Sequence, residues 1–254
     1  MLARYIEIVF YRAGAELRRD ASRAYLGVLW WFLEPILYMA VFYLVFGLGL
    51  RKGGPDFIVY LLTGLIVWRW LDGAVRASTG AILTSVGLMQ QVYLPKILLP
   101  AVIVVMHSYK FLIVFSVFLL FLTLAWKMPV SPAWWALPVL MTIQLVLICA
   151  LAGLVAGIIP IVPDFKFLVD FGMTLLFFMS GIFFDVHELT PAIQDIIRYN
   201  PMVTFIDAYR QVLLFGQAPQ WDALLKILLV AVILLASVCV MLKRLDRYYP
   251  RVVG

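Results

Sequence analysis

The sequence predicts an all-α integral membrane protein with six transmembrane helices, and three features of its composition support this. Hydrophobic residues make up 65% of the 254-residue chain, against about 45–50% in an ordinary soluble domain. Charged residues make up only 13%, about half of the usual share. The apolar residues gather in runs of about 20, the length that crosses a membrane as a helix. A soluble fold could not bury all of these runs.

The first 22 residues predict an amphipathic helix that lies in the membrane interface. At about 100° per residue, one side is apolar and carries Leu2, Ile6, Val9, Phe10, Ala13 and Leu17. The opposite side carries Arg4, Glu7, Tyr11, Arg18 and Arg19. A short soluble helix packed on a partner would show the same pattern, and both descriptions can hold together.

Six apolar runs follow, each long enough for a helix that spans the hydrocarbon core at about 1.5 Å rise per residue. The predicted spans are residues 27–50, 57–81, 98–126, 133–160, 167–184 and 223–242. Turn residues such as Gly53, Gly54 and Pro55 separate neighbouring runs. We expect residues 1–254 to form a single transmembrane domain.

Basic residues indicate which side of the membrane each loop occupies. The net charge is +6, and arginines populate the N-terminal segment, while the C-terminal tail carries Lys243, Arg244, Arg247 and Arg251. The short loops of the other side hold only Arg51, Lys52 and Lys127. This bias predicts that both termini are cytoplasmic. The basic residues sit beside apolar runs, so we expect a membrane and no nucleic acid as their partner.

Two connections are too long to be simple turns. Residues 82–97 join the second and third spans on the cytoplasmic side, and residues 185–220 join the fifth and sixth on the outer side. In the outer connection apolar residues recur at helical spacing, and Pro191 and Pro201 divide it into two short helices. We expect this pair to be re-entrant and to dip into the outer leaflet, although a soluble helical hairpin would show the same pattern.

The chain has none of the motifs of common enzyme chemistry. It contains no Gly-Lys-Ser or Gly-Lys-Thr of a Walker A loop, no HExxH and no GxSxG. Its cysteines, Cys149 and Cys239, lie inside apolar runs without the spacing of a zinc site. We therefore expect no catalytic residue, metal or cofactor in this chain. If ATP drives it, a partner must bind the ATP and magnesium and hydrolyse the ATP.

Charged residues inside the predicted spans are the sharpest functional signal, because each bare charge at bilayer depth costs roughly 2.5–3.5 kcal/mol. Glu34 lies in the first span and Lys110 in the third. Arg69, Asp72 and Arg76 form a stripe at i, i+3 and i+7 in the second. Similar depths predict that Glu34 pairs with Arg69 and that Lys110 pairs with Asp72. Such pairs could stabilise the bundle or act on the substrate, and the sequence leaves both roles open.

Six short motifs occur in a specific order along the chain. They are YLGVLWWFLEP at 25–35, LPKILLP at 94–100, PDFK at 163–166, SGIFF at 180–184, Asn200-Pro201 and Tyr209-Arg210. In this order they resemble the membrane subunits of type-2 ABC exporters for polysaccharides, the permeases of O antigen, capsule and teichoic acid. Two positions depart from that family, since Pro163 replaces its Arg and Gly181 replaces its Pro. The local roles of these two residues therefore do not carry over.

The resemblance implies a homodimer that moves a lipid-linked polysaccharide across the cytoplasmic (inner) membrane of a bacterium, with two copies of a cytoplasmic ABC ATPase. It makes residues 82–97 the coupling helix that contacts the ATPase, where a solvated connector is the alternative. The implied contact residues are Gln90, Gln91, Tyr93 and Lys96, with Arg18 and Arg19 of the interface helix as a second contact.

Aromatic stripes on two spans are candidates for the walls of the substrate path. Trp31, Tyr38 and Phe42 share one face of the first span, and Phe171, Thr174 and Phe178 share one face of the fifth. Sugar rings can pack their C–H faces on aromatic rings, and the resemblance makes these two spans the channel walls. Packing against lipid or neighbouring helices would produce the same stripes.

Two other functions stay open. The same fold serves exporters of drugs or small lipids. An intramembrane enzyme acting on a polyprenyl lipid is the third candidate, and it would need acids or histidines clustered at one membrane face, which the sequence does not show.

Overall fold

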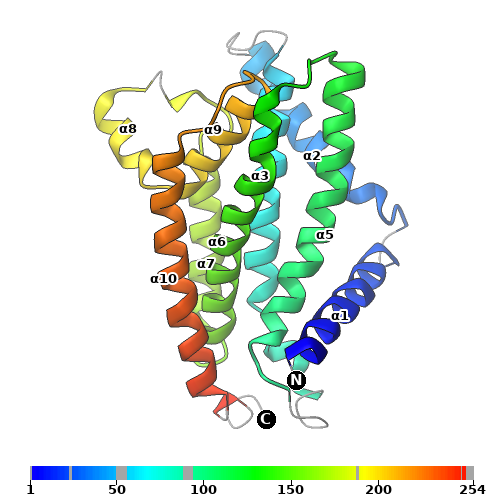
Figure 1. Cartoon of the computed structure of the whole chain (residues 1–254), viewed down its shortest axis with the longest axis vertical. Coiled ribbons are helices and arrows are strands. Elements are labelled where there is room, and N and C mark those ends of the chain that lie inside the picture. The colour runs from blue at the N-terminus through cyan, green and yellow to red at the C-terminus, as the bar shows by residue number, and fades with distance from the viewer. Residues whose placement is uncertain are drawn as a thin grey trace.

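The computed structural model describes residues 2–22, 25–49, 56–87, 94–186, 189–246 and 248–249. Within these residues every regular element is a helix, as the composition predicts. The long helices run up and down one bundle, and both ends of the chain lie at the same end of it (Figure 1). We call this the terminal end. The opposite, distal end carries α8 (Pro191–Arg198) and α9 (Pro201–Leu213).

Helix α1 (Leu2–Ser22) lies obliquely across α5 (Leu98–Leu120) near the terminal end (Figure 1). Val9 and Ala13, from the predicted apolar side, are buried against Val102 of α5. The residues of the predicted polar side are exposed, namely Arg4, Glu7, Tyr11, Arg18 and Arg19. The amphipathic helix therefore forms as predicted and packs through one side, while its place in a membrane interface stays a prediction.

Among the described residues, five segments are long and apolar enough to cross a membrane, and each coincides within a few residues with a predicted span. They are Leu29–Gly47, Phe57–Ser78, Leu98–Ala125, Pro132–Ile158 and Trp221–Leu245. Their α-helices are α2 (Leu29–Phe42), α3 (Phe57–Ser78), α5, α6 (Leu137–Ile158) and α10 (Trp221–Leu245). The chain continues in wider π-helical turns after α2 and after α5.

The helix of the predicted fifth span is shorter than expected. This helix, α7, covers Phe165–Phe178, whereas the sequence predicts residues 167–184. Its 14 residues extend only about 21 Å, less than the hydrocarbon thickness, so α7 is not among the five segments. The helix ends early because Gly181 adopts a φ of 67°, a left-handed conformation that turns the chain. The predicted extent to residue 184 is wrong.

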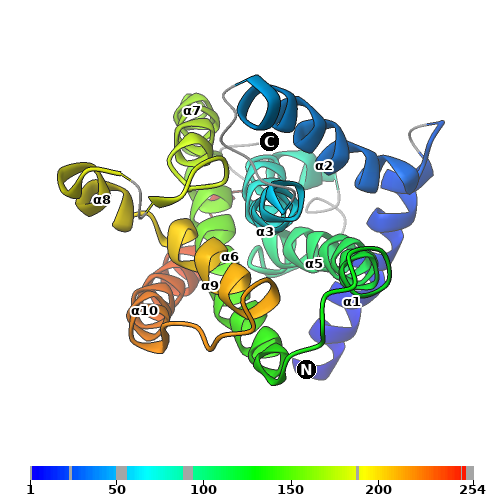
Figure 2. The same cartoon turned by 90° about the horizontal axis from the view of Figure 1, so that it is seen from above.

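Helix α3 occupies the centre of the bundle, and the other long helices surround it (Figure 2). It packs against α2, α5, α6 and α9, and most of its length is buried. In contrast, α2 lies at the periphery and buries almost none of its length within this chain. A residue on α3 therefore faces other helices, whereas α2 has a long surface free to meet lipid or another subunit.

The two short helices predicted before the last span are present at the distal end. Each has Pro in its first turn, Pro191 in α8 and Pro201 in α9, where a missing N–H costs no hydrogen bond. The Asn200 side chain caps α9 by accepting a hydrogen bond of 3.0 Å from the Met202 backbone N–H. Helix α9 is largely buried and α8 largely exposed. Their depth in a membrane stays a prediction.

Candidate functional site

Three charged residues lie about one turn apart on α3. Asp72 stands between two arginines, because its carboxylate accepts a hydrogen bond of 2.7 Å from Arg76 Nε and lies 3.7 Å from Arg69. Charges inside a bundle are costly unless they are paired. The order base, acid, base lets one carboxylate compensate part of both neighbouring charges.

Neighbouring helices supply the other partners of this stripe. Glu34 of α2 forms an ion pair with Arg69. Asp170 of α7 lies 2.9 Å from Arg76, which also donates a hydrogen bond of 3.1 Å to the Thr174 hydroxyl. We call the set of five charged residues the α3 charge network, and its members are Glu34, Arg69, Asp72, Arg76 and Asp170. It contains two positive and three negative charges, and it ties α2 and α7 to the central helix.

The structure brings Glu34 and Arg69 together as their depths predict, but it does not pair Lys110 with Asp72. The ammonium of Lys110 lies 2.6 Å from a carboxylate oxygen of Asp20, at the end of α1. The predicted pairing with Asp72 is wrong, because Arg76 already occupies that carboxylate and α1 brings a separate acid to Lys110. Sequence reasoning missed Asp20, and it missed Asp170, although Asp170 precedes the predicted corridor residue Thr174 by one turn.

Asp20 connects three helices. It binds Lys110 of α5 and accepts a hydrogen bond of 3.2 Å from the indole N–H of Trp31, in the first turn of α2. The Lys110 ammonium also lies 5.4 Å from the centre of the Trp31 ring. Burial alone would raise the pKa of Asp20, but the hydrogen bond and charge of Lys110, together with the Trp31 hydrogen bond and the nearby His107, hold this pKa below its ordinary value. Asp20 is therefore ionised at neutral pH and fastens α1 to α2 and α5.

A cavity of about 250 Å³, which we call the aromatic cavity, lies between α2, α3 and α7. Four of the predicted corridor residues line it, namely Tyr38, Phe42, Thr174 and Phe178. Arg69, Asp72 and Arg76 of the α3 charge network line the same cavity. Aromatic rings from the first and fifth predicted spans therefore face a charged surface on α3.

The other aromatic residues of the cavity wall were not all predicted. Phe171 is 68% exposed and does not line this cavity, and Trp31 lines a different one. Sequence reasoning missed Phe177, which packs edge-on against the Tyr38 ring at 6.3 Å between ring centres. It also missed Phe183, which does not line the cavity itself but packs against the lining residue Phe42, with 4.0 Å between the ring centres. Phe183 follows the turn at Gly181, so helical periodicity could not place it.

A second cavity, of about 280 Å³, lies between α2, α3 and α5. Trp31, Glu34, His107 and Lys110 are among its lining residues. Arg69, Asp72 and Arg76 line both this cavity and the aromatic cavity. The α3 charge network is therefore in contact with both cavities, and a change in its pairing would alter the walls of both.

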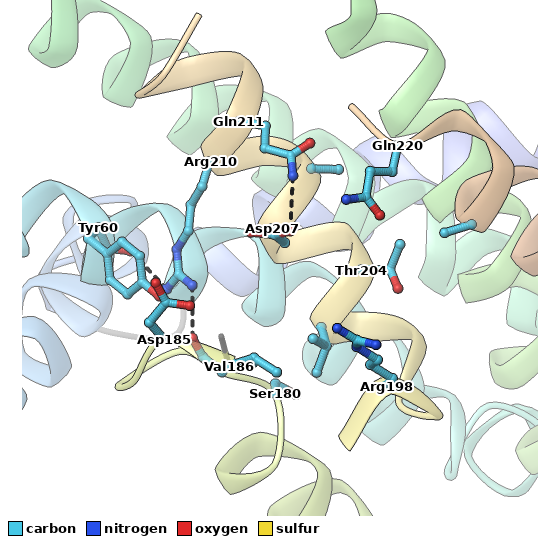
Figure 3. A pocket seen from close by; sticks show the side chains of 14 residues that line it. Tyr60, Ser180, Asp185, Val186, Arg198, Thr204, Asp207, Arg210, Gln211 and Gln220 are labelled. Carbon is cyan, nitrogen blue, oxygen red and sulfur yellow. Dashed lines mark hydrogen bonds between the residues drawn. The ribbon is translucent and has the colours of Figure 1, made fainter. Parts of the chain in front are cut away.

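At the distal end, Arg210 of α9 holds the turn that follows α7 (Figure 3). Its guanidinium donates hydrogen bonds to the carbonyls of Gly181 (2.8 Å), Ile182 (3.0 Å) and Tyr60 (3.2 Å), and it stacks on the Tyr60 ring. Asn200 donates to two carbonyls at the end of α7. Carbonyls at a helix C-terminus lack intrahelical partners. Asn200 and Arg210 therefore supply hydrogen-bond donors to the carbonyls at the end of α7 and in the turn after it. Three of the motifs quoted above, SGIFF, Asn200-Pro201 and Tyr209-Arg210, meet at this point.

A polar cavity of about 320 Å³ adjoins Arg210 (Figure 3). One face of α9 lines it with Thr204, Asp207 and Gln211, and Asp207 accepts a hydrogen bond of 3.1 Å from Gln211. The cavity lies at the distal end and shares no lining residue with the α3 charge network.

The residues implied as ATPase contacts fall into three groups. Arg18 and Arg19 are exposed on α1. Lys96 is only 3% exposed and pairs with Asp246, so its side chain is not presented to a partner in this structure. Gln90, Gln91 and Tyr93 lie outside the described residues.

The described part of the chain contains no group of three or more His, Cys, Asp or Glu side chains that could hold a metal ion. Cys149 and Cys239 are free thiols.

The chain is similar to known proteins over most of its length. O-antigen export system permease protein RfbA of Myxococcus xanthus is 29% identical over 224 residues, which cover 87% of this chain and 85% of that protein. A protein of the same name from Klebsiella pneumoniae is 25% identical over 202 residues, covering 79% and 78%. Polysialic acid transport protein KpsM of Escherichia coli is 23% identical, covering 83% and 81%.

The family model that matches this chain is that of the ABC-2 type transporter, over residues 13–214. This range contains Asp20, the α3 charge network, the aromatic cavity and Arg210, and it leaves out residues 1–12 and the last helix. The chain therefore belongs to the ABC-2 type transporter family.

Proposed function

We propose that this chain is the membrane subunit of an exporter that moves a lipid-linked polysaccharide, such as O antigen, across the cytoplasmic membrane of a bacterium. The similarity to RfbA and KpsM, whose names assign them to O-antigen export and polysialic acid transport, supports this cargo. The observation that carries the proposal is the aromatic cavity, where rings of two helices face the α3 charge network.

The surface beside this cavity is unsuited to lipid. Glu34 and Arg69 are each 33% exposed at the side chain, and Asp170 is 40% exposed. Charges at bilayer depth face a bundle interior or water and avoid hydrocarbon. In contrast, the exposed residues of α10 are apolar along most of its length and include Leu225, Leu229, Val230 and Ile233. The α2 and α7 side therefore lines a hydrated path, and the α10 side faces lipid.

A second copy of the chain would close this path. Helix α2 buries almost none of its length within one chain, so it has an unused surface next to the aromatic cavity. Most oligomers of identical chains are two-fold symmetric, and such a dimer sets two aromatic cavities opposite one another. Sugar C–H faces then pack on Tyr38, Phe42 and Phe178, while hydroxyls bond to Thr174 and the charged residues.

Energy comes from a separate ATPase that binds the ATP and magnesium, because this chain has no Walker A motif. We further propose six crossings, with the short α7 and the turn that follows it together forming the fifth. The basic residues of the two ends support a cytoplasmic position for both termini. The ATPase then meets the exposed Arg18 and Arg19 of α1 and the segment between α3 and α5.

The test uses the chain expressed with its ATPase in cells that make the polymer but lack their own permease. Phe42→Ala with Phe178→Ala should slow export severalfold, with an unchanged amount of protein in the membrane. The matched control is Leu229→Ala with Ile233→Ala on α10, which should export normally. Normal export by the phenylalanine pair, or failure of both pairs to accumulate in the membrane, would contradict the assignment of the path. If the wild-type complex moves no polymer, the proposed cargo itself is wrong.

A further inference from the structure

Tyr249 holds the segment that follows α10 against the terminal end of the bundle. This side chain is completely buried, and its hydroxyl donates a hydrogen bond of 3.0 Å to the carbonyl of Gly157, at the end of α6. The neighbouring Tyr248 is 48% exposed. Of these two adjacent tyrosines, only Tyr249 packs inside the protein. The contact is therefore specific to one side chain and is not a general association of this segment with the bundle surface.

Three residues earlier, Asp246 binds Lys96, just before the third predicted span. Its carboxylate accepts a hydrogen bond of 2.9 Å from the backbone N–H of Lys96, and the Lys96 ammonium lies 4.0 Å away. Lys96 is buried, and a buried ammonium is costly unless an opposite charge compensates it. The pair therefore fixes both the backbone and the side chain at the end of the segment between α3 and α5.

The first residues of the segment between α3 and α5 pack beside its last residues. Ala81 and Ile82, which follow α3, are buried in one apolar cluster with Leu99, which follows Lys96. Val238 and Leu242 of α10, Ala156 of α6 and Tyr249 complete this cluster. Both ends of residues 82–97 are thus held by α6, α10 and the chain end, whatever the middle of the segment contacts.

Helices α6 and α10 pack closely at this level. A Cβ at Gly153 would lie 2.7 Å from Val238, and one at Gly157 would overlap Met241. Two glycines four residues apart let helix backbones approach closely, as small residues do in membrane bundles. The two helices are therefore packed tightly against each other near the terminal end.

We propose that Asp246 and Tyr249 are positioning residues that join residues 82–97 to the α6–α10 pair, so that a push on this segment moves the pair as a whole. This rests on the proposed function, in which the ATPase pushes on that segment. Without the contacts of Asp246 and Tyr249, the segment would bend at its ends. The ATPase would then hydrolyse ATP without moving the helices. Because α10 leads back to α9 and Arg210, the moved unit reaches the distal end.

The test compares four variants in the complete complex of the permease with its ATPase. Tyr249→Phe removes only the hydroxyl, Asp246→Asn keeps an acceptor for the Lys96 N–H but loses the charge, and Asp246→Ala loses both. Tyr248→Phe is the matched control. The readouts are polymer exported, ATP hydrolysed by the purified complex, the ATPase retained on the permease, and the amount of permease in the membrane.

The expected result is a fall in polymer exported per ATP, with unchanged membrane amount and retained ATPase. Tyr249→Phe should lower this ratio about fivefold, the change that corresponds to one net hydrogen bond. Asp246→Ala should lower it further than Asp246→Asn, and Tyr248→Phe should not lower it. If all four variants and the wild type export the same amount of polymer per ATP, the proposed role of Asp246 and Tyr249 is wrong. It is also wrong if the fall is explained entirely by a smaller amount of permease in the membrane or by loss of the ATPase from the complex. The wild-type complex must export in the same assay, so failure of the proposed function shows itself separately.

Discussion

Replacement of Lys110 by Met should destabilise the protein, because the carboxylate of Asp20 then loses its partner while α1 still holds it against α5. Replacement of Asp20 by Asn should be harmful for the same reason, since it leaves the ammonium without a counter-charge. When both are replaced together, no uncompensated charge remains. The double variant should therefore lose less stability than the two single losses added together.

The size of the coupling follows from the distance and the exposure of the pair. At 2.6 Å, two unit charges attract by about 6 kcal/mol if the effective dielectric constant is about 20. Water screens much of this, because the side chain of Asp20 is 38% exposed and that of Lys110 is 19% exposed. Exposed pairs contribute up to about 1 kcal/mol, and breaking a buried pair costs about 3–5 kcal/mol. We expect a coupling free energy of about 2 kcal/mol.

The assay is a double-mutant cycle on the free energy of unfolding, measured in mixed micelles with increasing denaturing detergent. The matched control cycle combines Lys110→Met with Asp72→Asn, two residues that do not pair, and its losses should add to within about 0.5 kcal/mol. The Lys110–Asp20 pairing would be refuted if their losses of unfolding free energy are additive while those of Lys110 and Asp72 are coupled. That result would support the Lys110–Asp72 pairing predicted from depth along the spans.

Four further outcomes are expected. The pKa of Asp20 is lowered in the folded protein, so the ion pair with Lys110 stabilises the fold above about pH 3.9, the unfolded value. This stability is lost as the pH falls through the folded pKa. The coupling free energy measured at pH 7 should therefore persist at pH 5, and its loss at pH 5 would contradict the lowered pKa. Gly181→Ala should cost about 1–2 kcal/mol of unfolding free energy, because a side chain is strained at a φ of 67°, and an unchanged value would contradict that backbone conformation. Arg210→Met should cost at least about 3 kcal/mol in the same assay, because three backbone carbonyls lose their donor, whereas a loss below 1 kcal/mol would show that other groups satisfy them. In a cysteine-free background, an impermeant thiol reagent added from outside should label a cysteine at Gly53 and not one at Gly254; the reverse pattern would overturn the orientation.

Helix positions were predictable where hydrophobicity alone sets them. Each of the five long segments begins and ends where charged or turn residues interrupt an apolar run. Helix α7 shows the limit of this signal, since the apolar run continues through Phe184 while the helix stops at Phe178. The turn depends on Gly181 and on Arg210 and Asn200, which reach it from later parts of the chain. Hydropathy contains no information on such distant partners.

Pairings across helices were predictable only in part, because depth along a span does not say which way a side chain points. Glu34 and Arg69 have similar depths and also face each other. Lys110 has the depth of Asp72 but points toward Asp20, on a helix outside the predicted spans. Lys96 shows the same limit at the terminal end, because its partner Asp246 follows 150 residues later. The sequence identifies charged residues inside spans, but depth alone pairs only some of them correctly.

The α3 charge network has consequences for what accompanies a polymer along the proposed path. Its three carboxylates and two guanidinium groups leave one surplus negative charge beside the aromatic cavity. In a two-fold dimer both copies contribute this surplus, and walls of low dielectric constant screen it weakly. A cargo with phosphate or carboxylate groups is repelled by such walls unless cations travel with it. The proposed path should therefore favour neutral sugar units, and acidic units should enter it only together with their counter-ions.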